Sequence, residues 1–327
     1  MGENFPSEIE VTPDEGNRRL DLFLRGRLPG VSRAWWKARI EDGQVLRNGR
    51  PAKKSDLVAA GDRIDLSRLS PPVEIGLRPG IAEDLVVRYE DESVVVVEKE
   101  AGLPTIPKNG EETNALACRL VARFPELRSV GKPLEAGLLH RLDTGTSGLL
   151  VAARNDEAYA RLREQWRWRR VEKEYVALVA GAVERPFTVL LPIGHHPKSA
   201  KRMVAGKGRT AETCVRPVWR GARVSVVIAD LREGRRHQIR LHLAESGHPV
   251  IGDPLYGRVR EGKERGSDGP RLMLHAFSIR FRVDPEGEPI RVLSEPPEDF
   301  TGEVRRRLGR EGVEAMLRDL RRGSPGR

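Results

Sequence analysis

The chain has few cysteines, few aromatic residues and no long apolar run. Cys118 and Cys214 are the two cysteines among 327 residues, too few for a disulfide framework and without the paired spacing of a zinc site. No segment reaches the roughly 20 apolar residues that a membrane-spanning helix needs. The acidic amino terminus, MGENFPSEIE, is unlike a signal peptide. These absences predict a cytoplasmic protein with no membrane contact and no metal site.

Positive charge is abundant by comparison. Lys and Arg number 58 against 48 Asp and Glu, a formal net charge of +10. A basic protein suits a polyanion, because each cation near a phosphate releases condensed counterions. An evenly solvated basic surface would give the same total, but the charge here is clustered. Residues 17–70 hold thirteen bases and six acids, whereas residues 1–16 hold five acids and no base.

Residues 17–70 have the pattern of two short helices followed by tight hairpins. Apolar residues recur at spacings of three and four at Leu20, Phe23, Leu24 and Leu28. Ser32 is a good N-cap for a second helix that ends at Asp42, before Gly43. Asn48-Gly49 is a strong hairpin signal. Residues 1–16 show no usable periodicity and are expected to form a loose leader.

The length predicts at least two domains. Apolar runs predict strands at 94–97, 149–153, 175–179, 189–191 and 224–229, with helices at 114–123 and 157–165 between them. This irregular order favours an α+β fold with a mixed, largely antiparallel β-sheet and flanking helices. The expected division is a leader (1–16), a small basic module (17–70), a linker (71–80), the larger domain (81–300), and a basic C-terminal helix and tail (301–327).

The segment HRLDTGTSGLL, residues 140–150, contains the most informative acid of the chain. It places Asp143 on a turn of small and polar residues that leads into a predicted buried strand. The hydroxyls of Thr146 and Ser147 can fix such a turn and present the carboxylate at the strand edge. On these grounds alone, a turn-stabilising aspartate is favoured over a catalytic one.

The same segment resembles the catalytic motif R-L-D-x-x-T-S-G-L of the RluA-type pseudouridine synthases. The family's other segments are resembled, in order, by VVVVEKEAGLPT, VEKEYVALV, GRRHQIRLHLAESGHPVIGDPLYG, RLMLHAFSIRF and SEPPEDF. Glu100 stands where the family usually has Pro, and Arg236 where it usually has Thr. Residues 17–67 resemble the alpha-L RNA-binding module of ribosomal small-subunit protein four, through RLDLFL, GVSRAWWKARIEDGQVLRNGRPAKKSD and AGDRIDL.

The resemblance implies an enzyme that isomerises specific uridines in RNA to pseudouridine, with one catalytic aspartate and no cofactor. Asp143 is then the catalytic acid, and Tyr175 stacks on the target base. Arg240 is expected to form an ion pair with Asp143, because a partly buried carboxylate needs a cationic partner. Two alternatives stay open: Tyr175 as a core aromatic of its strand, and Arg240 as a surface residue that pairs with Glu245.

Other residues are expected to contact RNA. Arg141 either enters the helix that the everted uridine vacates or binds phosphate, and His237 lies in the motif that carries Arg240. The expected RNA contacts of the basic module and of a basic loop near His195 and His196 are Arg33, Lys37, Arg39, Lys53, Lys54 and Arg202. Trp166 and Trp168 lie among Arg167, Arg169 and Arg170. Two roles are equally favoured for these tryptophans: stacking on RNA, or burial before a strand.

Large-subunit ribosomal RNA is the expected substrate, because a module of this kind usually accompanies such enzymes within the family, and the protein is expected to be a monomer. Transfer RNA is the alternative substrate. Two other functions compete: a non-catalytic RNA-binding or ribosome-assembly factor, and an N-glycosidase that releases the base.

Overall fold

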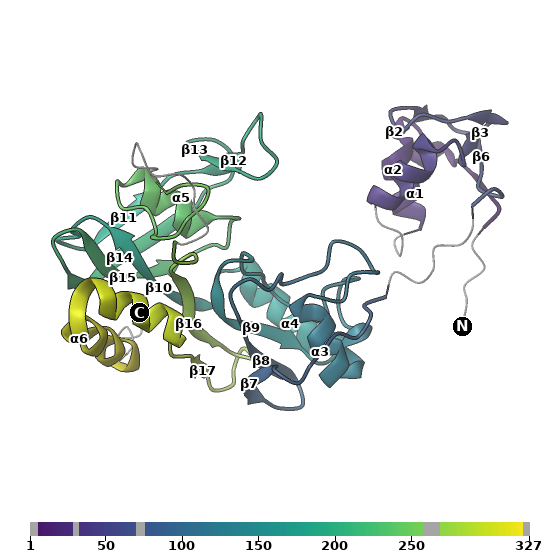
Figure 1. Cartoon of the computed structure of the whole chain (residues 1–327). Coiled ribbons are helices and arrows are strands. Elements are labelled where there is room, and N and C mark those ends of the chain that lie inside the picture. Colours follow the sequence, from purple (N-terminus) through teal and green to yellow (C-terminus); the bar gives the residue numbers. More distant parts are fainter. Residues whose placement is uncertain (1–5, 29–32, 70–75, 258–268, 323–327) are drawn as a thin grey trace. The chain divides into compact units, whose positions relative to one another are not determined.

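The structure is a computed structural model that describes residues 6–28, 33–69, 76–257 and 269–322. The chain divides into two compact units, Met1–Gly76 and Leu77–Arg327, each with its own apolar core. Figure 1 shows the elements of each unit. None of the helices in the described ranges has the length and apolar character required to cross a bilayer.

The smaller unit packs two helices against short strands. The helices are α1 (Leu20–Arg27) and α2 (Arg33–Glu41). A sheet in the order β1, β6, β3, β4 comprises Glu8–Glu10, Arg63–Asp65, Leu46–Arg47 and Arg50–Pro51, and β2 (Arg18–Arg19) pairs with β5 (Leu57–Val58). The helical spacing predicted from the sequence is confirmed, because Leu20 and Leu24 of α1 and Trp36 and Ile40 of α2 are buried in one core.

The predicted hairpin at Asn48-Gly49 is present, with positive φ at both residues as a two-residue type I′ connection requires. The expected loose leader is wrong for part of its length. Glu8–Glu10 forms β1, which pairs with β6, and Val11 is buried. Unpaired edge groups of β6 account for this ordering, since β1 supplies their hydrogen-bond partners. Ser32, the predicted N-cap of α2, lies outside the described residues.

The larger unit is built on one long sheet. Its described strands run in the order β11 (Phe187–Leu190), β14 (Glu212–Arg220), β15 (Val224–Leu231), β10 (Glu172–Ala180), β16 (Leu274–Phe281), β9 (Ser147–Ala153), β8 (Val94–Lys99) and β7 (Val86–Glu90). β17 (Ile290–Leu293) also pairs with β16. The pairing of β16 with β9 is parallel and the other pairings are antiparallel. The predicted α+β fold with a mixed, largely antiparallel sheet is confirmed.

Helices pack on this sheet through apolar faces. They are α3 (Leu116–Arg123), α4 (Asp156–Arg167), α5 (Gln238–Glu245) and α6 (Glu298–Arg322), with a short 3-10 turn, η2 (Pro125–Arg128). α4 begins where the side chain of Asn155 accepts the backbone N–H of Ala158 at 2.9 Å, a standard N-cap. The predicted basic tail helix is present but kinked, because Gly309, with a φ of 74° and a ψ of −173°, interrupts the helical backbone of α6. Phe300, Val304 and Met316 of α6 are buried in the sheet's core.

The backbone at residues 251–252, directly before Asp253, packs tightly against residues 270–273. Ile251 donates to the carbonyl of Leu178 and accepts the N–H of Met273, both at 2.9 Å, so the chain is sandwiched beside β10. The next residue, Gly252, has a φ of 77°, and a Cβ there would lie 1.9 Å from the carbonyl oxygen of Arg271. Only glycine fits this position without moving the backbone.

We expect Gly252→Ala to lower the free energy of unfolding of the larger unit by about 3 kcal/mol or more, because left-handed strain adds to the clash. Gly247→Ala is the matched control. Gly247 has a φ of 82°, and no atom of another residue lies within 4 Å of the place that a Cβ would take, so strain alone should cost about 1 kcal/mol. Urea unfolding measures both, and equal losses would contradict the steric argument.

Candidate active site

The turn that carries Asp143 is held by backbone and side-chain hydrogen bonds. Thr146 donates its backbone N–H to the carbonyl of Asp143 at 3.0 Å, directly before β9 begins. Thr105 Oγ1 donates to the carbonyl of Leu142 at 2.8 Å and accepts the backbone N–H of Leu142 at 3.2 Å. The backbone on both sides of Asp143 is therefore fixed, while its side chain stays 24% exposed. The carboxylate is accessible from outside.

The hydroxyls of this turn act differently from the sequence expectation. Thr146 Oγ1 is buried without a hydrogen-bond partner among the described residues. Ser147 Oγ lies 2.9 Å from Nδ1 of His275 and so joins β9 to β16. The predicted turn-fixing roles of these two hydroxyls are wrong, because the backbone N–H of Thr146 and the hydroxyl of Thr105 hold the turn instead.

A buried lysine supports the same turn from inside. Lys99, at the end of β8, is completely buried, and its Nζ donates to the carbonyls of Glu100 at 2.7 Å, Leu103 at 2.8 Å and Thr144 at 3.2 Å. Burial lowers the pKa of Lys99 to about 7, although the negative charge of Asp143 opposes this shift. These three bonds connect the loop after β8 to the residue that follows Asp143.

Arg240 on α5 lies between two carboxylates. Its Nη1 lies 2.7 Å from Oδ2 of Asp143, so the ion pair predicted from the sequence is present. Its Nε and Nη2 lie 2.8 and 2.9 Å from the two carboxylate oxygens of Asp253. Burial alone would lower the pKa of the Arg240 guanidinium, but the hydrogen bonds and charges of Asp253 and Asp143 raise it above its ordinary value.

Asp253 fixes Arg240 rigidly. Its side chain is fully buried, and Oδ1 also accepts the backbone N–H groups of Leu255 at 2.8 Å and Tyr256 at 3.0 Å. Burial raises the pKa of Asp253, but the bonds from Arg240 lower it by more, so the net shift is downward. Asp253 contacts Arg240 through Nε and Nη2, which leaves Nη1 for Asp143. One guanidinium thus lies between two carboxylates.

His237 is the second basic side chain beside Asp143. It lies in left-handed backbone directly before α5, with a φ of 58°, and its Nε2 is 3.8 Å from Oδ1 of Asp143. Tyr256 Oη accepts the N–H of Met203 at 2.8 Å and lies 2.9 Å from Nδ1 of His237. The tyrosine hydroxyl can donate to Nδ1, and a neutral ring in that arrangement would have its hydrogen on Nε2, facing Asp143. Burial lowers the pKa of His237 despite the opposing charge of Asp143, which favours the neutral ring.

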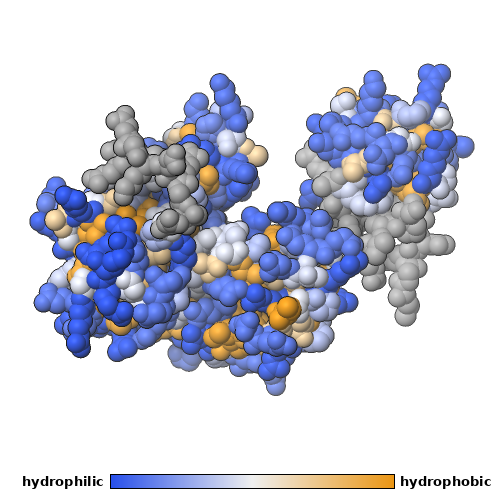
Figure 2. All heavy atoms as spheres, in the orientation of Figure 1, coloured by the Kyte–Doolittle hydropathy of each residue, from blue (hydrophilic) through white to orange (hydrophobic). Residues whose placement is uncertain are grey.

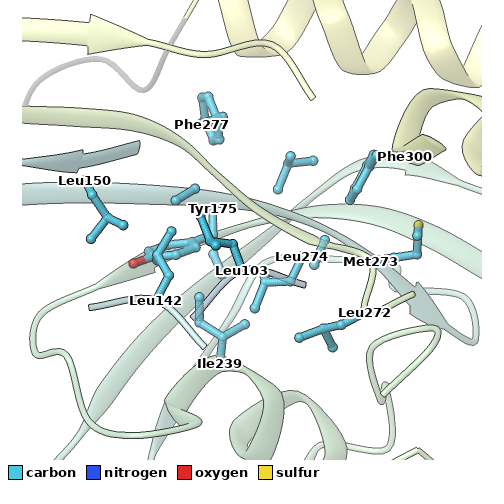
Figure 3. Close-up of a cluster of buried hydrophobic side chains, with 14 of the residues drawn as sticks. Leu103, Leu142, Leu150, Tyr175, Ile239, Leu272, Met273, Leu274, Phe277 and Phe300 are labelled. Carbon is cyan, nitrogen blue, oxygen red and sulfur yellow. The ribbon is translucent and has the colours of Figure 1, made fainter. Parts of the chain in front are cut away.

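Tyr175 lies in β10 and packs with apolar side chains of the core. Figure 3 shows Tyr175 in the same cluster of buried apolar side chains as Leu103, Leu142 and Ile239. Burial, and secondly the charge of Asp143, raise the pKa of the Tyr175 hydroxyl, which therefore stays protonated near neutral pH. The negative charge of Asp143 thus acts on the Tyr175 hydroxyl. The expected core position of Tyr175 is confirmed by its burial, and its stacking on a base stays a prediction.

Residues expected to contact RNA have different surroundings. Arg141 is exposed next to the turn that carries Asp143. Arg202 lies near β12 (Ile193–His195) and β13 (Met203–Ala205), and its guanidinium is 5.6 Å from the ring of Tyr256. In the smaller unit, Lys37 and Lys53 are exposed. Figure 2 shows that the visible face of this unit is mostly hydrophilic.

Two residues of the same expected set are already ion-paired within the smaller unit. Arg39 contacts Asp42 at 3.3 Å, and Lys54 contacts Glu41 at 2.7 Å. The side chain of Arg33 lies outside the described residues. The exposed lysines are therefore better placed for phosphate contact than the paired bases.

Four supporting residues of the site were not singled out from the sequence: Lys99, Thr105, Asp253 and Tyr256. All four occur in segments that resemble family motifs, and GDPLYG contains two of them. Asp253 lies in the turn GDPLYG, after α5. Nothing in that sequence shows that its carboxylate will pair with Arg240 of α5. Among the described residues, no group of His, Cys, Asp or Glu side chains is arranged to hold a metal ion.

Comparison with known proteins agrees with this geometry. A sequence profile described as RNA pseudouridylate synthase matches residues 93–245, and an S4 domain profile matches residues 18–64. An uncharacterized RNA pseudouridine synthase of Chloroflexus aurantiacus is 40% identical over 255 residues, 77% of this chain and 79% of the relative. The chain belongs to the RluA-type pseudouridine synthases.

Further members of the family match most of the chain. The ribosomal large subunit pseudouridine synthase D of Xanthomonas campestris is 34% identical over 89% of both chains. Among solved structures, Human RNA Pseudouridylate Synthase Domain Containing 1 is 29% identical, covers 68% of this chain and 89% of its own, and has a TM-score of 0.54. The family fold and the amino-terminal S4 domain expected from the sequence are both confirmed.

Replacing Asp253 with asparagine tests the support of Arg240. The amide keeps the shape but leaves the buried guanidinium with one charged partner, and breaking such a pair costs about 3–5 kcal/mol. We expect Asp253→Asn to destabilise the larger unit by that order and to reduce turnover strongly. Asp299→Asn is the control, since Asp299 pairs with Arg271 in the same bidentate way but is 56% exposed, and a surface pair contributes at most about 1 kcal/mol. Similar losses in urea unfolding would reject the proposed support.

Proposed function

We propose that this chain converts specific uridines of large-subunit ribosomal RNA to pseudouridine, with Asp143 as the catalytic residue. The observation that carries the proposal is the accessible carboxylate of Asp143, held 2.7 Å from an arginine that a second, fully buried carboxylate fixes. An acid that only stabilised a turn would not need a buried cation arranged in this way. The family membership supports the same reaction.

The reaction breaks the bond between C1′ of ribose and N1 of uracil and forms a bond between C1′ and C5. The C5 proton is lost to solvent and N1 gains a proton, so the product is an isomer of the substrate and no oxidant or reductant is consumed. A carboxylate can act on the anomeric carbon, where it would hold the ribose, or on the uracil ring, where it would hold the base, until the new bond forms. Asp143 is the acid that we assign to this step, and Arg240 is its positioning residue.

Tyr175 is proposed to receive the everted base. An enzyme that acts on a base must take it out of the stack, and an aromatic ring replaces part of the lost stacking. The phenol is protonated because burial raises its pKa, so it can donate a hydrogen bond but carries no charge beside Asp143. We assign the hydrogen of a neutral His237 ring to Nε2, which lies 3.8 Å from Asp143 Oδ1, where it would suit a hydrogen bond to an oxygen of the substrate.

The substrate assignment rests on relatives and on the smaller unit. Several relatives that align over most of this chain are ribosomal large subunit pseudouridine synthases D. The S4 domain supplies an exposed basic surface that includes Lys37 and Lys53. We further propose that the enzyme works as a monomer in the cytoplasm, where ribosomal RNA is available.

Tritium release distinguishes this function from the alternatives. RNA carrying tritium at C5 of uridine should lose it to solvent without releasing free uracil, whereas an N-glycosidase would release the base and a binding protein would do neither. We expect Asp143→Asn to reduce release by at least about a thousandfold while RNA binding persists, because no carboxylate then remains to act on the anomeric carbon or the uracil ring. Asp319→Asn on α6, which breaks the ion pair with Arg216, is the control. Turnover near wild type in Asp143→Asn would refute the assignment.

The role of the S4 domain can be tested by the salt dependence of binding. Removing both lysines with Lys37→Ala and Lys53→Ala should flatten the slope of log K against log salt by about 2, one phosphate contact for each charge. The control removes two bases from α6, Arg310→Ala and Arg318→Ala. Filter binding of ribosomal RNA at several salt concentrations gives both slopes, and an unchanged slope for the lysine pair would reject this RNA contact.

A further inference from the structure

The end of α4 presents an exposed tryptophan that the proposed chemistry does not use. Trp168 is 61% exposed. Among the described residues, it is the one aromatic member of the set of strongly exposed large apolar side chains. Trp166, two residues earlier, instead packs into the core against Phe281, with ring centroids 6.4 Å apart. The two tryptophans, equally ambiguous in sequence, thus have opposite environments. Single exposed apolar side chains are ordinary on protein surfaces, so the role of Trp168 is decided by the groups that surround it.

The turn around Trp168 is rigid. Arg169 donates its N–H to the carbonyl of Trp166 at 3.3 Å, and Arg170 donates to that of Gln165 at 2.9 Å, the paired bonds of a Schellman helix end. Arg169 occupies the left-handed position of this motif, with a φ of 57°, where glycine would be free of strain. The ring of Trp168 is therefore presented on a fixed backbone and not on a loose loop.

The strained arginine connects this turn to the active site. Its Nη1 lies 2.9 Å from Oε1 of Glu233, whose side chain is only 5% exposed and which precedes His237 by four residues. On the other side, the ring of His140 stacks on Trp166 with centroids 5.5 Å apart. His140 is three residues from Asp143, a chain span of at most about 11 Å. Both segments that hold the catalytic groups thus contact the Trp168 turn.

The charge around the ring favours nucleic acid. Arg167, Arg169 and Arg170 are exposed beside Trp168, and the guanidinium of Arg167 lies 5.6 Å from its ring centroid. Aromatic rings among basic groups are the elements with which proteins bind single-stranded RNA, the ring stacking on a base and the cations contacting phosphates. Tryptophan and arginine are also enriched at protein–protein interfaces, so the RNA substrate of the proposed function is what favours a base over a protein partner here.

We propose that Trp168 is a stacking platform for an unpaired base of the substrate RNA close to the target uridine, with Arg167 and Arg170 on its phosphates. This inference rests on the proposed function, since it places the platform beside the catalytic turn. It assigns recognition of single-stranded RNA to the larger unit, independently of the S4 domain. Arg141 is exposed. In the sequence it follows His140, which stacks on Trp166, and precedes Asp143 by two residues.

Binding of transcribed large-subunit ribosomal RNA to the full-length protein tests the platform. We expect Trp168→Ala to weaken binding roughly tenfold, within the range measured for loss of one base–aromatic stack. Trp168→Phe keeps a stacking ring and should lose no more than about threefold. Leu190→Ala is the matched control, because Leu190 on β11 is 69% exposed and has no arginine cluster beside it in sequence. Equal binding by Trp168→Ala and Leu190→Ala, or equal losses in the alanine and phenylalanine variants, would overturn the proposal.

Crosslinking locates the contact directly. Ultraviolet irradiation with 5-bromouridine-substituted ribosomal RNA should attach RNA to the peptide of residues 165–172, which cleavage after glutamate releases, and Trp168→Phe should abolish or strongly reduce that product. Absence of this crosslink from wild type would also overturn the platform.

Tritium release separates the two proposals. In an active enzyme, Trp168→Ala should raise KM and leave kcat within about twofold, whereas a wild type that binds RNA but releases no tritium contradicts only the proposed function.

Discussion

The arrangement of the active site depends on one buried guanidinium between two carboxylates. Arg240 is 6% exposed and contacts Asp253 through two atoms and Asp143 through one. A buried arginine is tolerated only where its charge and donors are satisfied. Asp253 satisfies most of them from the protein side, so the remaining donor orients Asp143 without enclosing it. The carboxylate of Asp143 is therefore both fixed in position and accessible from outside.

The remaining supports serve the same geometry from different directions. Lys99 holds the carbonyl that follows Asp143, and Thr105 holds the residue that precedes it. Tyr256 donates its backbone N–H to Asp253 and places its hydroxyl against His237. Each of these groups contacts the backbone beside Asp143 or a residue that itself contacts Asp143 or Arg240. The site is consequently a rigid frame around the partly exposed carboxylate of Asp143.

Sequence patterns predicted the parts of this protein that depend on local order. The helices of the smaller unit, the Asn48-Gly49 hairpin and the buried strands β8, β9 and β15 follow from spacing and apolar runs. The edge strand β7 was not predicted, because its residues alternate between exposed and half-buried and form no apolar run. The pairing of Glu8–Glu10 with β6 was missed for a similar reason, since a polar edge strand is stabilised by its neighbour's backbone. The Asp143–Arg240 pair came from motif resemblance, and Asp253 required the structure, because no local pattern shows which acid meets a distant arginine.

The sheet order has a consequence for how the polypeptide becomes active during synthesis. β16 lies between β10 and β9 and joins the strand group β11–β14–β15–β10 to the group β9–β8–β7. A growing chain that has not yet released residues 274–281 therefore has two separate half-sheets with unpaired edges, which are prone to aberrant association. The S4 domain, by contrast, is complete after about a fifth of the polypeptide has been made. A nascent chain can thus acquire its RNA-binding module long before it can assemble a catalytic site, and the last long strand acts as the closing element of the enzyme.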